Sequence, residues 1–304
     1  MSFASDIKNE LALVVCDKNC CKRAECYAML LFSRSFNESD ISFQTESQAA
    51  AKRYAHMLKL TVGVSAVIRQ PTAKGGMYTV SVAKKDIQRV LDYFYHTGRE
   101  VVLRINRANV EFECCQHAFI RGAFLCCGTT SNPASFYHAE FLVQRKQLSL
   151  DFINLLEEAG LSPKITERAG AYVIYFKDSG GIEDLLTMMH ATNSSLSLMN
   201  IKIEKDIRNR VNRRTNCETA NIDRTMRAVE DQISAINIIE RHGGLGILPK
   251  ELYEVALLRK ENPYTSLSEL SRMMDNTLSR SGINHRLKKI TEYAEKLEKD
   301  GQQG

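Results

Sequence analysis

The chain has 304 residues, of which 44% are hydrophobic and 25% charged, and its formal net charge is +5. This composition excludes a disordered chain and provides for about two domains with packed cores. No run of about 18 apolar residues is present, and the opening MSFASDIKNELALVV lacks the basic start and long apolar core of an export signal. We therefore expect a cytoplasmic protein that does not engage membranes.

Cysteine usage gives no clear sign of a metal or a disulfide framework. Nine cysteines, an odd number, predict reduced thiols in a chain without an export signal. Four of them cluster near the N-terminus: Cys16, Cys20, Cys21 and Cys26. Their spacing, C-x3-C-C-x4-C, is not a usual zinc-ligand pattern. The pairs at 114–115 and 126–127 fit small apolar residues on a buried helix. We expect no bound metal and no cofactor.

An internal repeat fills most of residues 20–190. The string GMYTVSVAKKDIQRVLDYF (76–94) resembles GAYVIYFKDSGGIEDLLTMM (170–189), at an offset of about 94 residues. Upstream, the apolar segments 24–36 and 117–131 occupy equivalent places at nearly the same offset. We therefore expect two copies of one folding unit.

Apolar periodicity predicts one order of elements in both copies: helix, strand, helix, two strands and a closing amphipathic helix. In the first copy these elements lie at 22–33, 42–45, 48–60, 65–70, 78–83 and 85–96. In the second they lie at 115–126, 138–143, 147–159, 164–168, 172–177 and 181–190. Gly75-Gly76 and Ala169-Gly170 predict hairpin turns. The fold class is α+β, with one mostly antiparallel sheet per copy and pseudo-twofold symmetry.

The first helix of each copy resembles the helix pair of the LAGLIDADG homing-endonuclease fold, a duplicated αββαββ-type domain. The resemblance implies that the two helices pack face to face through small side chains. Residues of this kind here are Ala28, Gly122, Ala123 and Cys126. Arg34 and Ser35 depart from the small residues usual at the end of the first motif, which leaves open how tightly the first helix packs.

The same resemblance implies a metal-binding acid as the penultimate residue of each motif. That position holds Ser33 in the first copy and Cys127 in the second. Mg²⁺ needs oxygen ligands, usually carboxylates, and two-metal phosphodiester cleavage needs them shared between both sites. We therefore interpret this domain as a scaffold without catalysis, and a metal-dependent DNA endonuclease is the alternative.

Residues 196–220 form a basic segment after the repeat. Between positions 202 and 214 it carries six basic residues against two acidic ones. The basic residues are Lys202, Lys205, Arg208, Arg210, Arg213 and Arg214. Two interpretations stay open: contacts to DNA phosphates, or a solvated linker between domains. From Asn221 an amphipathic helix is predicted, which ends at Gly243-Gly244.

The pattern of helix signals in residues 221–304 predicts an all-α domain. A helix begins at Pro249, a short helix follows the capping box Ser266–Glu269, and after a turn at 275–277 the last helix begins near Leu278. A short helix, a tight turn and a second helix rich in hydrogen-bond donors are typical of the helix-turn-helix. A charged helix on an ordinary helical bundle is the alternative.

The last helix carries the candidate DNA-binding residues, and no acid lies among them. They are Ser279, Arg280, Ser281, Asn284, His285, Arg286, Lys288 and Lys289. Arg and Asn can form bidentate contacts with guanine and adenine edges in the major groove. Arg286, Lys288 and Lys289 are better placed for phosphates.

Three strings connect these observations: MSFASDIKNEL (1–11), NRRTNCETAN (212–221) and SRSGINHRLKKI (279–290). Together they closely resemble the WhiA family of bacterial sporulation and cell-division regulators, over nearly the full length. The resemblance implies a non-catalytic, sequence-specific DNA-binding transcription regulator of cell division and chromosome segregation, with sporulation as the role in some relatives. A protein-interaction scaffold tethered to DNA is a further alternative.

The expected organisation is a LAGLIDADG-like pair of halves followed by a helix-turn-helix domain. We place the halves at 1–105 and 106–195, the basic linker at 196–220 and the helical domain at 221–304. The expected partner is double-stranded DNA of the nucleoid, with another transcription or cell-division protein as a second candidate. The sequence leaves the oligomeric state open.

Overall fold

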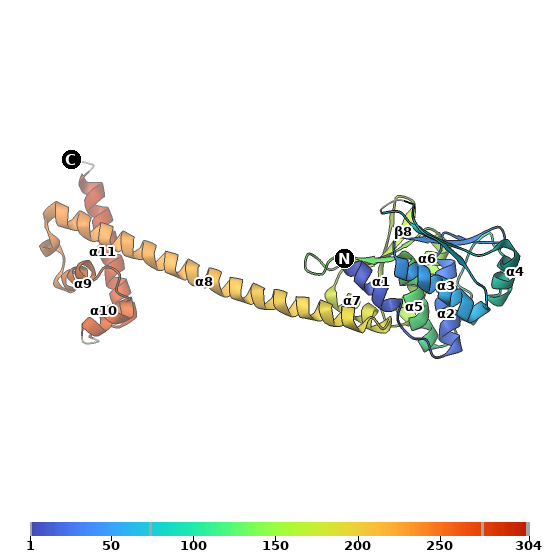
Figure 1. The fold of residues 1–304 in the computed structure, drawn as a ribbon. Coiled ribbons are helices and arrows are strands. Elements are labelled where there is room, and N and C mark those ends of the chain that lie inside the picture. Colours follow the sequence, from blue (N-terminus) through green and yellow to red (C-terminus); the bar gives the residue numbers. More distant parts are fainter. Residues whose placement is uncertain (1, 73–74, 275–276, 302–304) are drawn as a thin grey trace. The chain divides into compact units, whose positions relative to one another are not determined.

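The computed structural model describes residues 2–72, 75–274 and 277–301. The chain divides into two compact units, Met1–Asp206 and Ile207–Gly304 (Figure 1). No described helix combines the length and the apolar character that a membrane span needs.

Unit 1 contains the predicted repeat, preceded by the helix α1 (Phe3–Leu11). The elements of the first half are α2 (Asn19–Leu31), β1 (Ser35–Phe36), β2 (Ile41–Thr45), α3 (Gln48–Val62), β3 (Val67–Arg69), β4 (Tyr78–Ser81) and α4 (Lys84–Tyr93). After the 3-10 turn η1 (Arg107–Asn109), those of the second half are α5 (Glu113–Cys127), β5 (Gly128–Thr130), β6 (Ala139–Val143), α6 (Lys146–Glu158), β7 (Lys164–Arg168), β8 (Ala171–Phe176) and α7 (Ser179–Met188).

Each half has one antiparallel sheet of four strands, in the orders β1-β2-β4-β3 and β5-β6-β8-β7. The equivalent orders confirm the predicted duplication and the α+β class. The short strands β1 and β5 were not predicted, because two or three residues are too few to show an alternating pattern. In the second hairpin Ala169 and Gly170 both have positive φ, as the predicted turn requires.

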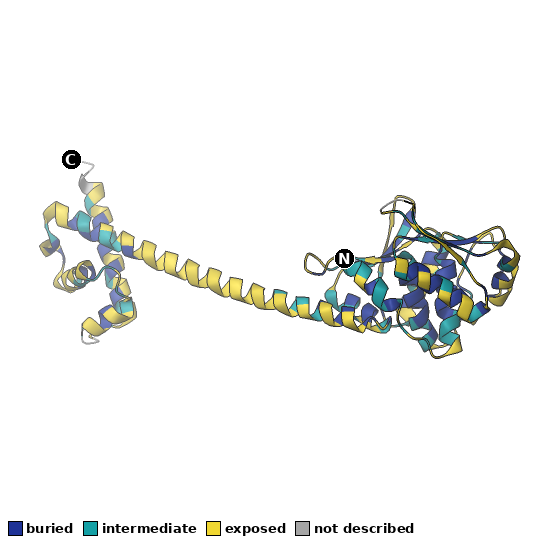
Figure 2. Cartoon of the chain, viewed as in Figure 1, coloured by how far each residue is buried: buried dark blue, intermediate teal, exposed yellow. Residues whose placement is uncertain are grey.

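The helices α2 and α5 pack directly against each other in the core of unit 1 (Figures 1 and 2). They approach each other closely at Gly122, where an added Cβ would lie 2.5 Å from the carbonyl oxygen of Glu25 and 3.0 Å from the Cβ of Ala28. About one turn after Gly122 on α5, the Cys126 thiol donates to the Met29 carbonyl at 3.5 Å. The predicted face-to-face packing through small residues is therefore confirmed.

The segment predicted as a linker is instead part of one helix, α8 (Thr192–Gly243), which has 52 residues. It begins well before Asn221, where the helix was expected. The sequence from 199 to 220 contains no Gly or Pro to interrupt a helix, and side chains four residues apart, such as Arg214 and Glu218 at 3.8 Å, support it. Residues 206–228 are all exposed (Figure 2), so no burial pattern marks them as helical.

Unit 2 is a helical domain whose core combines the last turns of α8 with four further elements. These are η2 (Leu245–Ile247), α9 (Lys250–Glu261), α10 (Leu267–Met273) and α11 (Arg280–Gly301). The predicted stripe of Ile283, Leu287 and Ile290 is fully buried in its core. The capping box of Ser266 and Glu269 is present at the start of α10. In the predicted turn at 275–277, residues 275 and 276 lie outside the described part of the chain.

Candidate nucleic-acid interface

The helices α10 and α11 are held as a pair by contacts at the turn between them. The buried Ser271 hydroxyl of α10 donates to the carbonyl of Leu278, just before α11 begins. The Ser279 hydroxyl accepts from the backbone N–H of Gly282 at 3.2 Å, so Ser279 caps α11. The core side chains Ile283 and Leu287 fix which face of α11 points outward. The result is a short helix followed by a capped helix with one face free.

Seven of the eight predicted DNA-binding residues on this segment are exposed. They are Ser279, Arg280, Ser281, Asn284, His285, Lys288 and Lys289. The eighth, Arg286, is half-buried: its Nη1 donates to the Glu251 carbonyl at 3.2 Å, and its Nη2 lies 3.3 Å from the Glu251 carboxylate. Arg286 therefore ties α11 to α9, and its predicted phosphate contact would compete with that bond.

The structure adds residues that the sequence did not single out. A depression of about 470 Å³ lies beside the start of α11, where Arg280 and Asn284 meet Ser266 and Ser268 of α10 and Arg224 of α8. Eleven residues separate Arg213 from Arg224, which is about three turns and places both on the same side of a helix. This spacing is the sequence feature that could have added Arg224 to the predicted basic residues.

A buried arginine shapes the edge of the same depression. Arg259 of α9 donates through Nη1 to the carbonyls of Pro263 at 3.1 Å and Thr265 at 2.7 Å. Burial lowers the pKa of Arg259. These bonds hold the chain between α9 and α10 in the path that presents the start of α10 beside α11.

The predicted basic stripe is divided between the two units. Lys202 and Lys205 belong to unit 1. Lys205 donates to the carbonyls of Pro133 at 2.6 Å and Ser135 at 3.4 Å, and it lies over the ring of Tyr137. Its ammonium group is therefore engaged within unit 1, which the sequence did not reveal. The remaining basic residues are exposed in unit 2: Arg208, Arg210, Arg213 and Arg214.

The motif ends of α2 and α5 in unit 1 carry no carboxylate. The Ser33 hydroxyl donates to the Leu30 carbonyl at 2.6 Å, and the Cys127 thiol donates to the Ala123 carbonyl at 3.3 Å. Each side chain is thus turned back onto its own helix. Burial lowers the pKa of Lys8, although nearby acidic groups including Cys127 oppose the shift.

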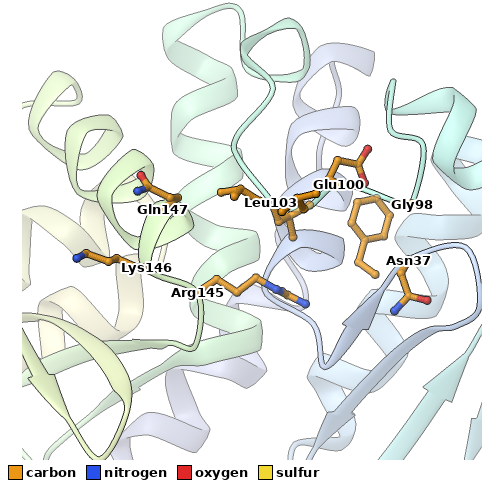
Figure 3. A pocket seen from close by; sticks show the side chains of 10 residues that line it. Asn37, Gly98, Glu100, Leu103, Arg145, Lys146 and Gln147 are labelled. Atoms are coloured by element: carbon orange, nitrogen blue, oxygen red, sulfur yellow. The ribbon is translucent and has the colours of Figure 1, made fainter.

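A polar pocket of about 490 Å³ lies beside the C-terminal end of α2, between the two halves of unit 1 (Figure 3). The Arg145 side chain points across it toward Asn37, while Lys146 and Gln147 point away. Arg145 already donates to the Leu31 carbonyl at 3.3 Å, and burial lowers its pKa. This pocket therefore offers fewer free donors than the surface of unit 2.

The four cysteines that lie close together in the sequence, Cys16, Cys20, Cys21 and Cys26, do not form one cluster in the structure. Cys16 donates to the Glu25 carboxylate at 3.1 Å, and Cys26 is buried in the core. Cys20 and Cys21 instead meet a pair from the second half at 114–115, and the four sulfur atoms lie within 4.8 Å of one another. The sequence predicted that Cys114 and Cys115 are small apolar residues on a buried helix, and this prediction does not explain why they meet Cys20 and Cys21.

Known families match both units. The model described as the WhiA LAGLIDADG-like domain matches residues 116–208, and that described as the WhiA C-terminal HTH domain matches 211–294. The "Probable cell division protein WhiA" of Alkaliphilus metalliredigens is 35% identical and covers 97% of this chain and 98% of its own. Its counterpart from Bacillus cereus is 37% identical, covering 98% and 97%.

A solved structure has the same fold. The crystal structure of full-length DUF199/WhiA from Thermatoga maritima superposes with a TM-score of 0.60 at 24% identity. The match covers 97% of this chain and 99% of that one. At this identity the likeness concerns the fold.

Proposed function

This chain belongs to the WhiA family, and from that premise we propose that it is a non-catalytic, sequence-specific DNA-binding protein. In this proposal it regulates transcription in cell division and chromosome segregation, acts at the nucleoid, and reads duplex DNA through the first turns of α11. The relatives' name supports the cell-division role. In some relatives the same regulator would serve sporulation.

The observation that carries the proposal is the outward face of α11. From Ser279 to Thr291 the segment contains no acidic residue, and its donors are exposed while its apolar stripe is buried. A helix entering the major groove presents its N-terminal residues to base edges, so Arg280, Ser281 and Asn284 are the candidates for sequence readout. Lys288 and Lys289 lie further along and suit the phosphate backbone.

Arg224 extends this surface onto α8. It borders the same depression as Arg280 and Asn284, so a DNA backbone passing the start of α11 would meet its guanidinium. The exposed arginines at 208, 210, 213 and 214 lie on the same helix and would supply further phosphate contacts. The engaged side chains of Lys205 and Arg286 contribute less.

Two variants of α11 should weaken binding in different ways. Once a bound sequence has been selected from genomic fragments, Asn284→Ala should cost about 1–3 kcal/mol of discrimination for it and leave non-specific binding intact. Lys288→Ala with Lys289→Ala should instead weaken binding to all duplexes and flatten the slope of log K against log salt by about two. Fluorescence anisotropy of the full chain across a salt series measures both.

Lys296→Ala is the matched control, since Lys296 is exposed on the same helix about two turns beyond Lys289. Its affinity and salt slope should equal those of the unchanged chain. Equal affinity of the unchanged chain for selected and unrelated duplexes, or no binding at low salt, would refute sequence-specific recognition.

The alternative of a metal-dependent endonuclease has its own test. Because Ser33 and Cys127 stand where the motif acids would lie, we expect supercoiled plasmid libraries to stay intact with Mg²⁺ or Mn²⁺. Gel electrophoresis measures nicking. A mock preparation from cells that lack the chain, purified in the same way, controls for contaminating nuclease. Cleavage at a defined sequence that the mock preparation does not show would establish the endonuclease.

A further inference from the structure

Four cysteines meet where the two halves of unit 1 join. Cys20 and Cys21 lie in the first turn of α2, and Cys114 and Cys115 in the first turn of α5. All four sulfur atoms lie within 4.8 Å of one another, and those of Cys20 and Cys21 are 4.0 Å apart. Within the described residues this is the one group of three or more cysteine, histidine or acidic side chains placed to share an ion.

The arrangement follows from the internal repeat. Cys20 and Cys114, like Cys21 and Cys115, are separated by 94 residues, the offset that relates the two halves. Each half contributes one adjacent pair at the start of its motif helix. The direct packing of α2 on α5 brings the two pairs together. A half-site of two sulfurs, doubled by pseudo-twofold symmetry, gives four ligands around one point.

The distances suit a single ion. Zinc holds four thiolates tetrahedrally with Zn–S of about 2.3 Å, so neighbouring sulfurs lie about 3.8 Å apart. Sulfurs already within 4.8 Å need only small side-chain movements to reach that spacing. An iron–sulfur cluster distributes its cysteines over several irons and spreads them more widely. Soft thiolate ligands in tetrahedral array favour zinc.

The sulfurs are also reachable. Cys115 is buried and the other three are half-buried. Cys21 and Cys114 border one surface depression, with His117 and His190 on its rim, and Cys20 and Cys115 border another on the side of Arg23. An ion has a path to the site from either depression.

We propose that Cys20, Cys21, Cys114 and Cys115 form a tetrathiolate site for one zinc ion, which joins the N-terminal ends of α2 and α5. Four protein ligands leave no open position, so the ion is structural and not catalytic. It fixes one end of the helix pair whose middle is fixed by the close approach at Gly122. This site belongs to unit 1 and does not depend on DNA binding by unit 2.

Metal analysis of the full chain is the first test. Protein purified under reducing conditions from zinc-supplemented medium should hold about one zinc per chain. The double variant Cys20→Ser, Cys115→Ser should hold almost none, while Cys217→Ser, which alters an exposed cysteine in unit 2, should keep its zinc. Cobalt substitution of the unchanged chain should give the visible spectrum of a tetrahedral tetrathiolate.

Differential alkylation makes the test independent of any variant. In the zinc-loaded chain, all four cysteines should resist alkylation and become reactive when a chelator removes the metal, as mass spectrometry of the peptides would show. Cys217 should react in both states. Substoichiometric zinc with no cobalt spectrum, protection unaffected by the chelator, or disulfides between the pairs in freshly isolated protein would each overturn the proposal.

Discussion

Glu25→Ala should lower the free energy of unfolding of unit 1 by about 3–5 kcal/mol, because it leaves two buried guanidinium groups without their counter-charge. Glu25 is fully buried on α2. Its carboxylate lies 2.6 Å from Nε of Arg53 on α3 and 2.6 Å from Nη2 of Arg121 on α5. The Cys16 thiol donates to the same carboxylate. One side chain thus connects four segments across both halves.

The same group predicts how stability changes with pH. Burial opposes ionisation of Glu25, but Arg121 and Arg53 hold its pKa below the ordinary value. A lowered folded-state pKa means that the stabilisation is present above the unfolded pKa, about 4.3, and is lost as the pH falls through the folded value. The Glu25→Gln variant, which keeps the shape and removes the charge, should lack this acid-dependent loss.

Urea titration combined with hydrogen exchange of the α2 and α5 peptides measures the effect within unit 1. Glu38→Ala is the matched control, since it removes a glutamate that pairs with Arg99 at the surface. An exposed pair of this kind contributes about 0–1 kcal/mol. A loss for Glu25→Ala no larger than that for Glu38→Ala would show that the buried network contributes little.

Gly122→Ala should separate α2 from α5 and destabilise unit 1 by about 1–3 kcal/mol, although alanine is the better helix former. The added Cβ would lie 2.5 Å from the backbone oxygen of Glu25, which cannot rotate away as a side chain could. The displacement would also disturb the pair of Glu25 and Arg121, since Glu25 is the contacted residue and Arg121 precedes Gly122. The same urea and exchange measurements on full-length protein report the change.

Gly180→Ala provides the control for a glycine inside a helix. Gly180 lies in α7, and an added Cβ there would meet only a side-chain oxygen of Asp178 at 3.4 Å. We expect this variant to be neutral or stabilising by up to about 1 kcal/mol. If Gly122→Ala behaved in the same way, the close approach of the two helices would not be a constraint on the fold.

The duplicated fold could be predicted because its signals are local and periodic. Buried faces of α3, α6 and β8 repeat at the intervals that helices and strands impose, and the two copies show them at one offset. The capping box at Ser266 and the buried stripe of α11 were read in the same way. The strands β1 and β5 were not predicted, because a strand of two or three residues is defined by its pairing with a neighbour and not by an alternating pattern.

The continuous helix α8 was missed for a related reason. Its middle buries nothing: the apolar residues there, Ile203, Ile207 and Val211, are exposed and stand among the basic side chains, so no buried face marked the helix. A basic, exposed stretch reads equally well as a linker. Only the backbone of the folded chain shows that residues 192–243 belong to one helix.

The candidate DNA-binding surface could also be predicted only in part. Composition and spacing picked out the donors of α11, because exposed polar residues alternate with core residues along the helix. They could not show that Arg286 is engaged by Glu251, that Lys205 binds two carbonyls of unit 1, or that Arg224 borders the depression beside α11. These facts depend on partners distant in the chain.

The order of residues alone revealed the repeat, the class of each domain, the absence of the motif acids and the donor-rich face of the last helix. Each of these is written in residues close together, where periodicity and residue type suffice. Which basic side chains are engaged and which cysteines meet depends on the folded chain. Packing α2 against α5 joins positions 94 residues apart, and no local pattern encodes that contact.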